Sequence, residues 1–182
     1  MPTSTPFHRL CGLLLLIAVS PAHAATFTVT IDDADAQASY GTVNNSSEGN
    51  SSPFFCDVDP APGNQNQCTL KAAIQVANFN GNGGSQLDTI NFLIPKITLT
   101  SSLNQITERV IIDGTSQPPR MEIDGGGRSC FDARGNGYPP GGGSPLLPQA
   151  NNSRFVSLVV HNCQGDAISL GGHGYAVFDS YI

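Results

Sequence analysis

The sequence predicts an all-β protein built from short strands, with one short α-helix ahead of most of them. After residue 24, apolar residues recur at helical spacing in one place only, at Leu70, Ala73, Ile74 and Ala77. Beyond that stretch they fall in short β-branched runs, each closed by Gly, Asn or Pro. Residues 154–160 can also be laid over residues 176–182 with an offset of 22 residues. An offset of this size is typical of repeat architectures, in which successive units stack on one another.

The expected elements can be placed along the chain. The helix begins after Thr69, whose hydroxyl suits the N-cap position, and a Gly/Asn-rich run at residues 80–84 ends it. An alternating segment at residues 26–31 predicts one strand before the helix. The strands expected after it share β-branched composition and are residues 89–94, 96–99, 109–112, 121–123, 129–132, 155–160, 167–170 and 175–182.

Linked motifs give this pattern a family resemblance. Residues 68–78 contain Cys-Thr-Leu-Lys-Ala-Ala and end in Ala-Asn, residues 88–92 read Asp-Thr-Ile-Asn-Phe, and residues 112–118 read Ile-Asp-Gly-Thr-Ser-Gln-Pro. In order and spacing these resemble secreted bacterial right-handed parallel β-helix proteins of the pectin-lyase-like superfamily, which carry a Cys-Ser-Leu-Arg-Glu-Ala motif near the N-terminus. The resemblance covers residues 26–182. It implies a right-handed parallel β-helix whose N-terminal coils carry the short helix as a cap.

One position departs from that family's motif. Where the family has Ser and Glu three residues apart, this chain has Thr69 and Ala72, so one of the two reciprocal capping contacts is missing. We expect the helix to form nevertheless, because tertiary packing dominates the stability of short helices. Leu70 and Ile74 are expected to plug the apolar end of the stacked strands.

Residues 1–24 have the features of a secretory signal peptide. Arg9 supplies a positive charge, residues 10–19 form a compact apolar run, and Ala22-His23-Ala24 is an A-x-A cleavage pattern. The apolar run is shorter than the roughly twenty residues that a membrane-spanning helix needs. We therefore expect a secreted or cell-surface protein without a transmembrane segment.

The charge of the chain limits which partners it can bind, and its length limits how many domains it can contain. The chain has a net charge of −6, and loss of Arg9 with the signal peptide leaves it still more acidic, which disfavours binding to nucleic acid or to anionic membranes. We expect an N-terminal strand and a disulfide-closed loop in residues 25–67, then the capping helix and the first coils in residues 68–182. Because the sequence ends inside an apolar run at Ile182, we expect further coils of the same protein to follow.

Four cysteines follow the signal peptide. Cys56 and Cys68 are the nearest pair, and a disulfide between them would close a polar loop. A metal site is the alternative, which the absence of Cys-x-x-Cys spacing and of a nearby His disfavours. Cys130 and Cys163 fit either a second disulfide or two buried free thiols.

Asp32, Asp33 and Asp35 form a small acidic group after the first predicted strand. They suggest a weak calcium site, but the Gly and the downstream Glu of an EF-hand loop are missing, so a solvated acidic turn is the favoured interpretation. No other cofactor is expected.

Few residues suggest catalysis. Only His161 and His173 remain after residue 24, and no Ser/His/Asp order or phosphate-binding loop is present. Asp132, Arg134 and Asp166 form a weak candidate surface site, although such residues also occur simply as turn residues at coil corners.

Two functions stay open. The first is a non-catalytic exported protein whose solenoid side contacts an extracellular polysaccharide or another cell-surface ligand. The second is a polysaccharide lyase or glycoside hydrolase whose active site lies largely in further coils; enzymes of this kind resemble the chain in fold only, and fold alone does not decide function.

Overall fold

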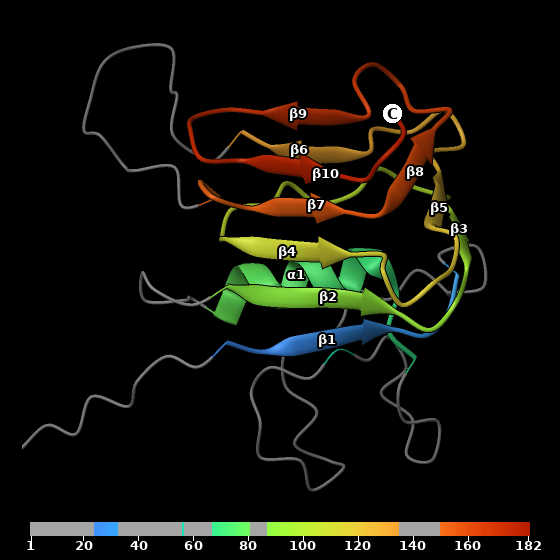
Figure 1. Ribbon diagram of the computed structural model, residues 1–182, viewed down its shortest axis with the longest axis horizontal. Helices are drawn as coiled ribbons and strands as arrows, with labels where there is room; N and C mark the ends of the chain where they lie inside the picture. Colours follow the sequence, from blue (N-terminus) through green and yellow to red (C-terminus); the bar gives the residue numbers. More distant parts are fainter. Residues whose placement is uncertain (1–23, 33–55, 57–66, 81–86, 135–149) are drawn as a thin grey trace, which may run out of the picture.

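The computed structural model describes residues 24–32, 56, 67–80, 87–134 and 150–182. These residues form ten β-strands and one α-helix, and every strand pair is parallel (Figure 1). The predicted all-β class with one short helix agrees with this structure. Most of the predicted signal peptide, together with Asp33 and Asp35, lies outside the described residues.

The strands belong to three sheets, here called A, B and C. Sheet A has the order β1-β2-β4-β7-β10, sheet B has β3-β5-β8, and sheet C has β6-β9. The strands of sheet A are β1 (Thr26–Val29), β2 (Asp88–Phe92), β4 (Val110–Asp113), β7 (Arg154–Val156) and β10 (Ala176–Phe178). Those of sheets B and C are β3 (Lys96–Thr98), β5 (Met121–Asp124), β8 (Leu158–His161), β6 (Phe131–Ala133) and β9 (Ile168–Leu170).

The chain visits the three sheets in a fixed order, and one such circuit is here called a pass. From β4 it runs through β5 in sheet B and β6 in sheet C, and β7, β8 and β9 then repeat the circuit. An earlier pass has β2 and β3, and residues 103–106 take the third side. There the Leu103 N–H donates to the Ser129 carbonyl (3.1 Å) and the Ile106 N–H to the Asp132 carbonyl (2.7 Å). Each pass is therefore hydrogen-bonded to the next on all three sides.

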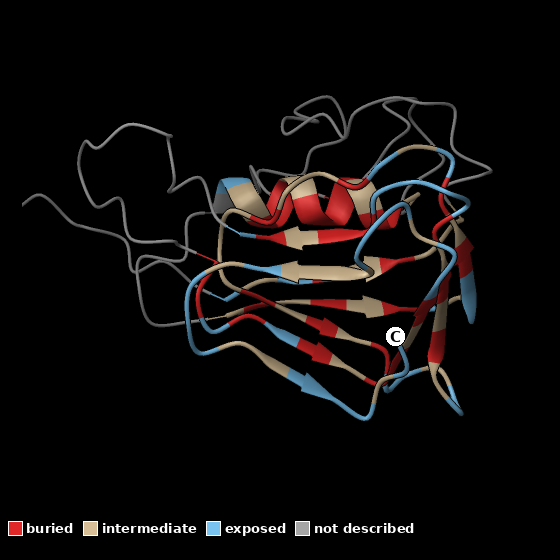
Figure 2. Ribbon diagram, turned by 90° about the horizontal axis from the view of Figure 1, so that it is seen from above, coloured by how far each residue is buried: buried red, intermediate tan, exposed pale blue. Residues whose placement is uncertain are grey.

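A row of apolar side chains runs through sheet A and is here called the central ladder. Register pairs its members in sequence across the five strands: Phe27, Ile90, Ile112, Phe155 and Val177. The first four are buried, whereas Val177 on the last strand is 40% exposed. Figure 2 shows buried and less buried residues alternating along several strands, and β2 and β4 follow this pattern throughout, as a period of two requires. Burial of this ladder fixes the register, because a slip by one residue would turn apolar side chains outward.

Helix α1 (Leu70–Asn80) packs against β1 and β2, behind sheet A in the view of Figure 1. It begins after Thr69, as predicted, and the Thr69 hydroxyl accepts a hydrogen bond from the Ala72 N–H at 3.1 Å. The residues of its predicted apolar face are all buried: Leu70, Ala73, Ile74 and Ala77. The exposed fraction of Ile74 is 1%, so this side chain belongs to the same core as the central ladder.

Asn78 joins the other end of α1 to the third side of the first complete pass. Its Nδ2 donates to the Gln105 carbonyl (2.7 Å), and its Oδ1 accepts from the Thr107 N–H (2.8 Å) and the Glu108 N–H (3.3 Å). The side chain thus supplies hydrogen-bond partners to a backbone segment that has no strand beneath it. Replacing Asn78 would leave these buried or half-buried groups unsatisfied.

Two predicted strands were wrong in extent. The run at residues 155–160 is not one strand, because Ser157 has a positive φ of 56° and turns the chain from sheet A into sheet B between β7 and β8. The run at residues 175–182 contains only β10, after which Asp179 (φ 45°) makes the equivalent turn. A left-handed conformation is uncommon outside glycine, so serine gives no sequence signal for it and aspartate, which adopts it more often, gives only a weak one.

The turn at residues 113–120 ties neighbouring passes together. The Ser116 hydroxyl (2.6 Å) and the Gln117 side-chain amide (2.8 Å) both donate to the Phe92 carbonyl at the end of β2. On the opposite side, a Cβ atom on Gly114 would lie 2.3 Å from the Ser157 carbonyl oxygen, so only glycine fits. The Gly-Thr-Ser-Gln motif is therefore explained by packing between passes.

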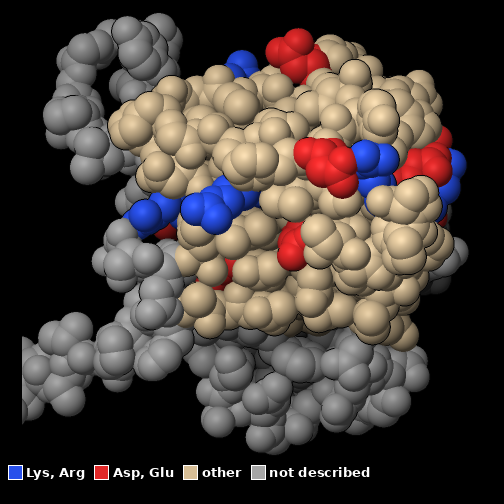
Figure 3. All heavy atoms as spheres, in the orientation of Figure 1, with Lys and Arg blue, Asp and Glu red and all other residues tan. Residues whose placement is uncertain are grey.

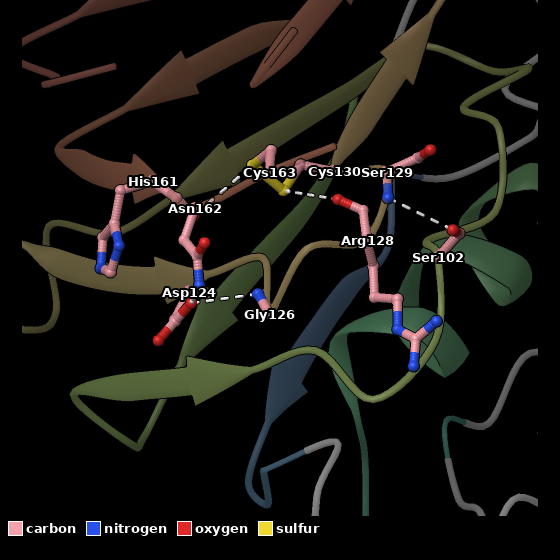
Figure 4. The surroundings of a disulfide bond; sticks show 9 residues. All are labelled: Ser102, Asp124, Gly126, Arg128, Ser129, Cys130, His161, Asn162 and Cys163. Carbon is pink, nitrogen blue, oxygen red and sulfur yellow. Dashed lines mark hydrogen bonds between the residues drawn. A yellow bond between two sulfur atoms is a disulfide. The ribbon is translucent and has the colours of Figure 1, made fainter. Parts of the chain in front are cut away.

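Two disulfides are present. Cys56 bonds to Cys68, the residue two before α1, and Cys130 bonds to Cys163 (Figure 4). The second bond joins two successive passes at the corner between sheets B and C, which settles the alternatives left open for these two cysteines. A Cβ atom on Gly125 would lie 2.7 Å from the Cys130 sulfur, so the disulfide occupies space that only a glycine leaves open. Among the described residues, no helix is long and apolar enough to span a membrane.

Candidate functional site

The predicted surface site lies on the outer face of sheet C. The Arg134 guanidinium binds the Asp132 carboxylate with two hydrogen bonds, Nε to Oδ1 at 3.0 Å and Nη2 to Oδ2 at 2.8 Å. Asp166 contacts a neighbour of this pair: its Oδ2 accepts from the Ser169 hydroxyl at 3.2 Å, and Ser169 is the register partner of Asp132. The structure thus brings Asp132 and Arg134 into contact and places Asp166 beside them.

The chemistry of this group is that of an ion pair. Hydrogen bonds from Arg134 lower the pKa of Asp132, and those to Asp132 raise the pKa of Arg134. Both groups therefore stay charged at neutral pH. A carboxylate held ionised in this way cannot serve as a general acid, and Asp132 is satisfied by a bidentate partner that a substrate would have to displace.

A second polar group, missed from the sequence, lies on the outer face of sheet B and is here called the sheet B cluster. It consists of Lys96, Glu122, Asp124, His161 and Asn162. Glu122 Oε1 lies 2.8 Å from Lys96 Nζ and 3.0 Å from His161 Nε2. The Asn162 side-chain amide donates to Asp124 Oδ1 at 2.9 Å (Figure 4).

The register of the strands in successive passes brings the residues of this cluster together. Lys96 of β3 pairs with Glu122 of β5, and Asp124 pairs with His161 of β8. The alternation Met121-Glu122-Ile123-Asp124 indicates from sequence that the two carboxylates share a face. Their neighbours on that face depend on how many residues each pass contains. That number varies along the chain, so the sequence gives no constant offset from which to find them.

The carboxylates of the sheet B cluster are held in their charged forms. Hydrogen bonds from Lys96 and then His161 lower the pKa of Glu122. The backbone N–H of Gly126, followed by the Asn162 amide, lowers the pKa of Asp124. The bond to Glu122 raises the pKa of Lys96 in turn. The cluster is consequently an exposed array of fixed charges, hydrogen-bond donors and acceptors at neutral pH.

The outer face of sheet A differs from these two clusters in how its charged groups are distributed. Figure 3 shows that, on the part of this face formed by described residues, charged groups are few and acidic and basic groups are interspersed. This part of the face offers no continuous basic surface in that view for a phosphate backbone.

Glu108 differs from the other carboxyl groups. Burial raises its pKa, Arg109 opposes that shift, and the charge of Asp88 adds to it. Its N–H is among the groups held by Asn78. A general acid needs a carboxyl whose pKa is shifted in this direction, so Glu108 is a candidate general acid among the described residues.

The predicted calcium position receives no support from the residues that the structure describes. Asp32 Oδ1 accepts a hydrogen bond from the Thr98 N–H at 2.7 Å, which ties the end of the first strand segment to sheet B. Within the described residues, no group of three or more His, Cys, Asp or Glu side chains is arranged to hold a metal ion. Calcium binding there stays a prediction from the sequence.

Comparisons with known proteins return nothing. No family model, curated protein or solved structure matches this chain.

Proposed function

We propose that this chain is an exported right-handed parallel β-helix protein that binds extracellular polysaccharide, or another cell-surface ligand, without catalysing a reaction. The fixed visiting order of the three parallel sheets and the unbroken central ladder support the β-helix. The two disulfides are compatible with an oxidising compartment. The role of the motif residues in binding one pass to the next supports the family resemblance.

The observation that carries the function is the exposed sheet B cluster. Consecutive strands of a sheet are about 4.8 Å apart, so its side chains form a regular row of polar groups along the stack. Sugar hydroxyls both donate and accept hydrogen bonds, and carboxylate, amide and ammonium groups match them. Because Glu122 and Asp124 are kept ionised, the row is suited to contact and not to proton donation.

Binding to a panel of extracellular polysaccharides tests this proposal. The exported protein is passed over immobilised polysaccharides, alongside a Glu122→Gln/Asn162→Ala variant and a control variant, Asp132→Asn, in the sheet C pair. We expect the first variant to lose at least tenfold in affinity and the control to bind as the parent does. Equal binding by all three, or no binding by the parent to any polysaccharide, would remove the cluster from the proposal.

A second candidate function is a polysaccharide lyase or glycoside hydrolase, for which Glu108 is the specific observation. Burial raises its pKa, which is the direction that a proton donor to the leaving oxygen of a glycosidic bond requires. Release of reducing ends from polysaccharides, measured with the parent and with Glu108→Gln, distinguishes the candidates. Activity that disappears in the variant while thermal stability is kept favours the enzyme, and binding without activity favours the non-catalytic protein.

A further inference from the structure

The start of the first strand is held by a buried carboxylate. The backbone N–H of Ala25 donates to Asp88 Oδ1 at 2.7 Å, and the Ala25 carbonyl accepts from the Thr89 N–H at 2.8 Å. Asp88, the first residue of β2, has an exposed fraction of 0%, and Ala25 is half-buried. A carboxylate is thus aimed at one particular backbone nitrogen at the edge of sheet A.

That nitrogen belongs to the bond that the predicted signal cleavage breaks. The Ala22-His23-Ala24 pattern places the scissile peptide between Ala24 and Ala25, and Ala24 is exposed. Hydrolysis of that bond adds one water: the carbonyl of Ala24 becomes a carboxylate that leaves with the signal peptide, and the nitrogen of Ala25 becomes an α-amine. At neutral pH the amine binds a proton, because its ordinary pKa is about 7.7–8.0.

We propose that removal of the signal peptide after Ala24 creates an ion pair between the new α-ammonium group of Ala25 and the buried carboxylate of Asp88, and that this pair locks β1 onto β2. The inference rests on the proposed export of the protein. It adds a function for processing itself: cleavage supplies the positive charge that the buried carboxylate faces.

The gain comes from replacing a neutral donor by a charged one. A hydrogen bond between two ionised groups is shorter and about twice as strong as one between neutral groups. A close cation offsets the hydration that a carboxylate loses on burial. In the precursor the same nitrogen is an amide, so the contact exists without its charge.

Within the described part of the chain, the charged residues Glu108 and Arg109 lie just before β4. The charge of Asp88 acts on Glu108, and so does the charge of Arg109, the residue next to it. β1 contributes only uncharged residues, Thr26–Val29, and the neighbouring end of α1 contributes Asn78 and Phe79. The ordinary pKa of an α-amine is about 7.7–8.0, so the loss of its charge falls within the range from about pH 7 to about pH 10.

The Asp88 carboxylate determines whether the stability of the folded protein rises or falls with pH. A carboxylate beside it raises the pKa of the α-amine in the folded protein above its unfolded value. The stabilisation is then fully present below about pH 7.7 and is lost as the pH rises through the folded value. A group whose folded pKa is one unit higher changes the folding equilibrium constant tenfold.

The test compares proteins that differ only at the N-terminus. One begins at Ala25, and the other carries a single added Ser before Ala25, which restores the amide and moves the ammonium group by about 3.8 Å. We expect the ratio of folded to unfolded protein to be about tenfold higher for the first at pH 7, with the difference gone near pH 10. In an Asp88→Asn background, the two N-termini should give equal stability at pH 7.

Two further measurements separate this inference from the proposed export. N-terminal sequencing of the exported protein should begin at Ala25. Another start site would overturn the ion pair and leave export standing, and unprocessed intracellular protein would overturn both. Acylation of the α-amine at pH 7 should be at least tenfold slower in the folded protein starting at Ala25 than in the Ser-extended one. Equal stability and equal acylation of the two forms would overturn the ion pair, even if Asp88→Asn does not fold.

Discussion

Removing the Cys130–Cys163 disulfide should destabilise the protein more than removing Cys56–Cys68. The two bonds close loops with sequence separations of 33 and 12 residues. Closing these loops lowers the conformational entropy of the unfolded chain. In the chain-entropy description, this stabilises the folded protein by about 3.7 and about 2.8 kcal/mol respectively. The longer loop also joins two passes at the corner between sheets B and C, where Cys130 is 2% exposed and Gly125 contacts its sulfur.

Urea unfolding of Cys130→Ala/Cys163→Ala and Cys56→Ala/Cys68→Ala, each against the parent, measures both losses. For a chain of this length, about 3.7 kcal/mol corresponds to a fall in Tm of about 7–15 °C. The slope of unfolding free energy against urea should also increase, because an unfolded chain without the cross-link exposes more surface. That increase separates an effect on the unfolded state from a loss of native contacts.

Two results would contradict the reasoning. The first is a Cys130→Ala/Cys163→Ala variant within about 1 kcal/mol of the parent. The second is a larger loss from removing the shorter loop, which would mean that loop length does not determine the order. The single variant Cys163→Ala serves as a control, since it breaks the same bond and should lose nearly as much as the double variant.

Three other predictions follow from the packing and the charges. Ile74→Asp should cost about 3 kcal/mol or more by placing an unpaired charge in the core, whereas Gln75→Asp on the less buried side of α1 should melt near the parent temperature. Gly114→Ala should cost about 1–3 kcal/mol in urea titrations, because its new methyl group meets the Ser157 carbonyl. Glu122→Gln should make the loss of stability in acid less steep. The pKa of Glu122 is lower in the folded protein than in the unfolded chain, where it is about 4.3. Ionised Glu122 therefore stabilises the protein above about pH 4.3, and this contribution disappears as the pH falls through the folded pKa. Thermal melts of parent and variant between pH 2 and 6 check this, and identical profiles would show that the contacts of Glu122 do not contribute.

The sequence predicted the local elements well, because each is determined by nearby residues. The spacing of apolar residues defined α1, and Thr69 marked its start; the alternation in β2 and β4 separated inward from outward positions. The offset of 22 residues correctly paired Phe155 with Val177. These features depend on helical and strand periodicity, which a sequence displays directly.

What the sequence could not supply was the pairing between distant passes. Val110 and Ser153 lie in contact although they are 43 residues apart, so the 22-residue offset fails there. Without that register, the sheet B cluster could not be assembled from its residues. The turn at Ser157 could not be predicted from the sequence either. Its left-handed backbone is imposed by packing between sheets and not by the conformational preference of serine.

The roles of the motif residues were predictable only in part. Asn78 was noted as part of an Ala-Asn pair, and the structure shows its side chain bonded to three backbone groups of a later segment. Asp132 and Arg134 were grouped by charge and proximity in sequence, and their contact follows because strand residues two apart share a face.

The central ladder has a consequence for how such a chain can change in length. Its rungs are 22 residues apart between Ile90 and Ile112, 43 between Ile112 and Phe155, and again 22 between Phe155 and Val177, yet the ladder continues without a break. The apolar rungs, and not the length of the connections, thus decide where each strand returns. Lengthening a flexible connection costs little free energy, since doubling it adds only about 0.6 kcal/mol. Insertions at the outer corners can therefore accumulate without disturbing the core, which makes those corners suitable places to graft foreign peptides for display.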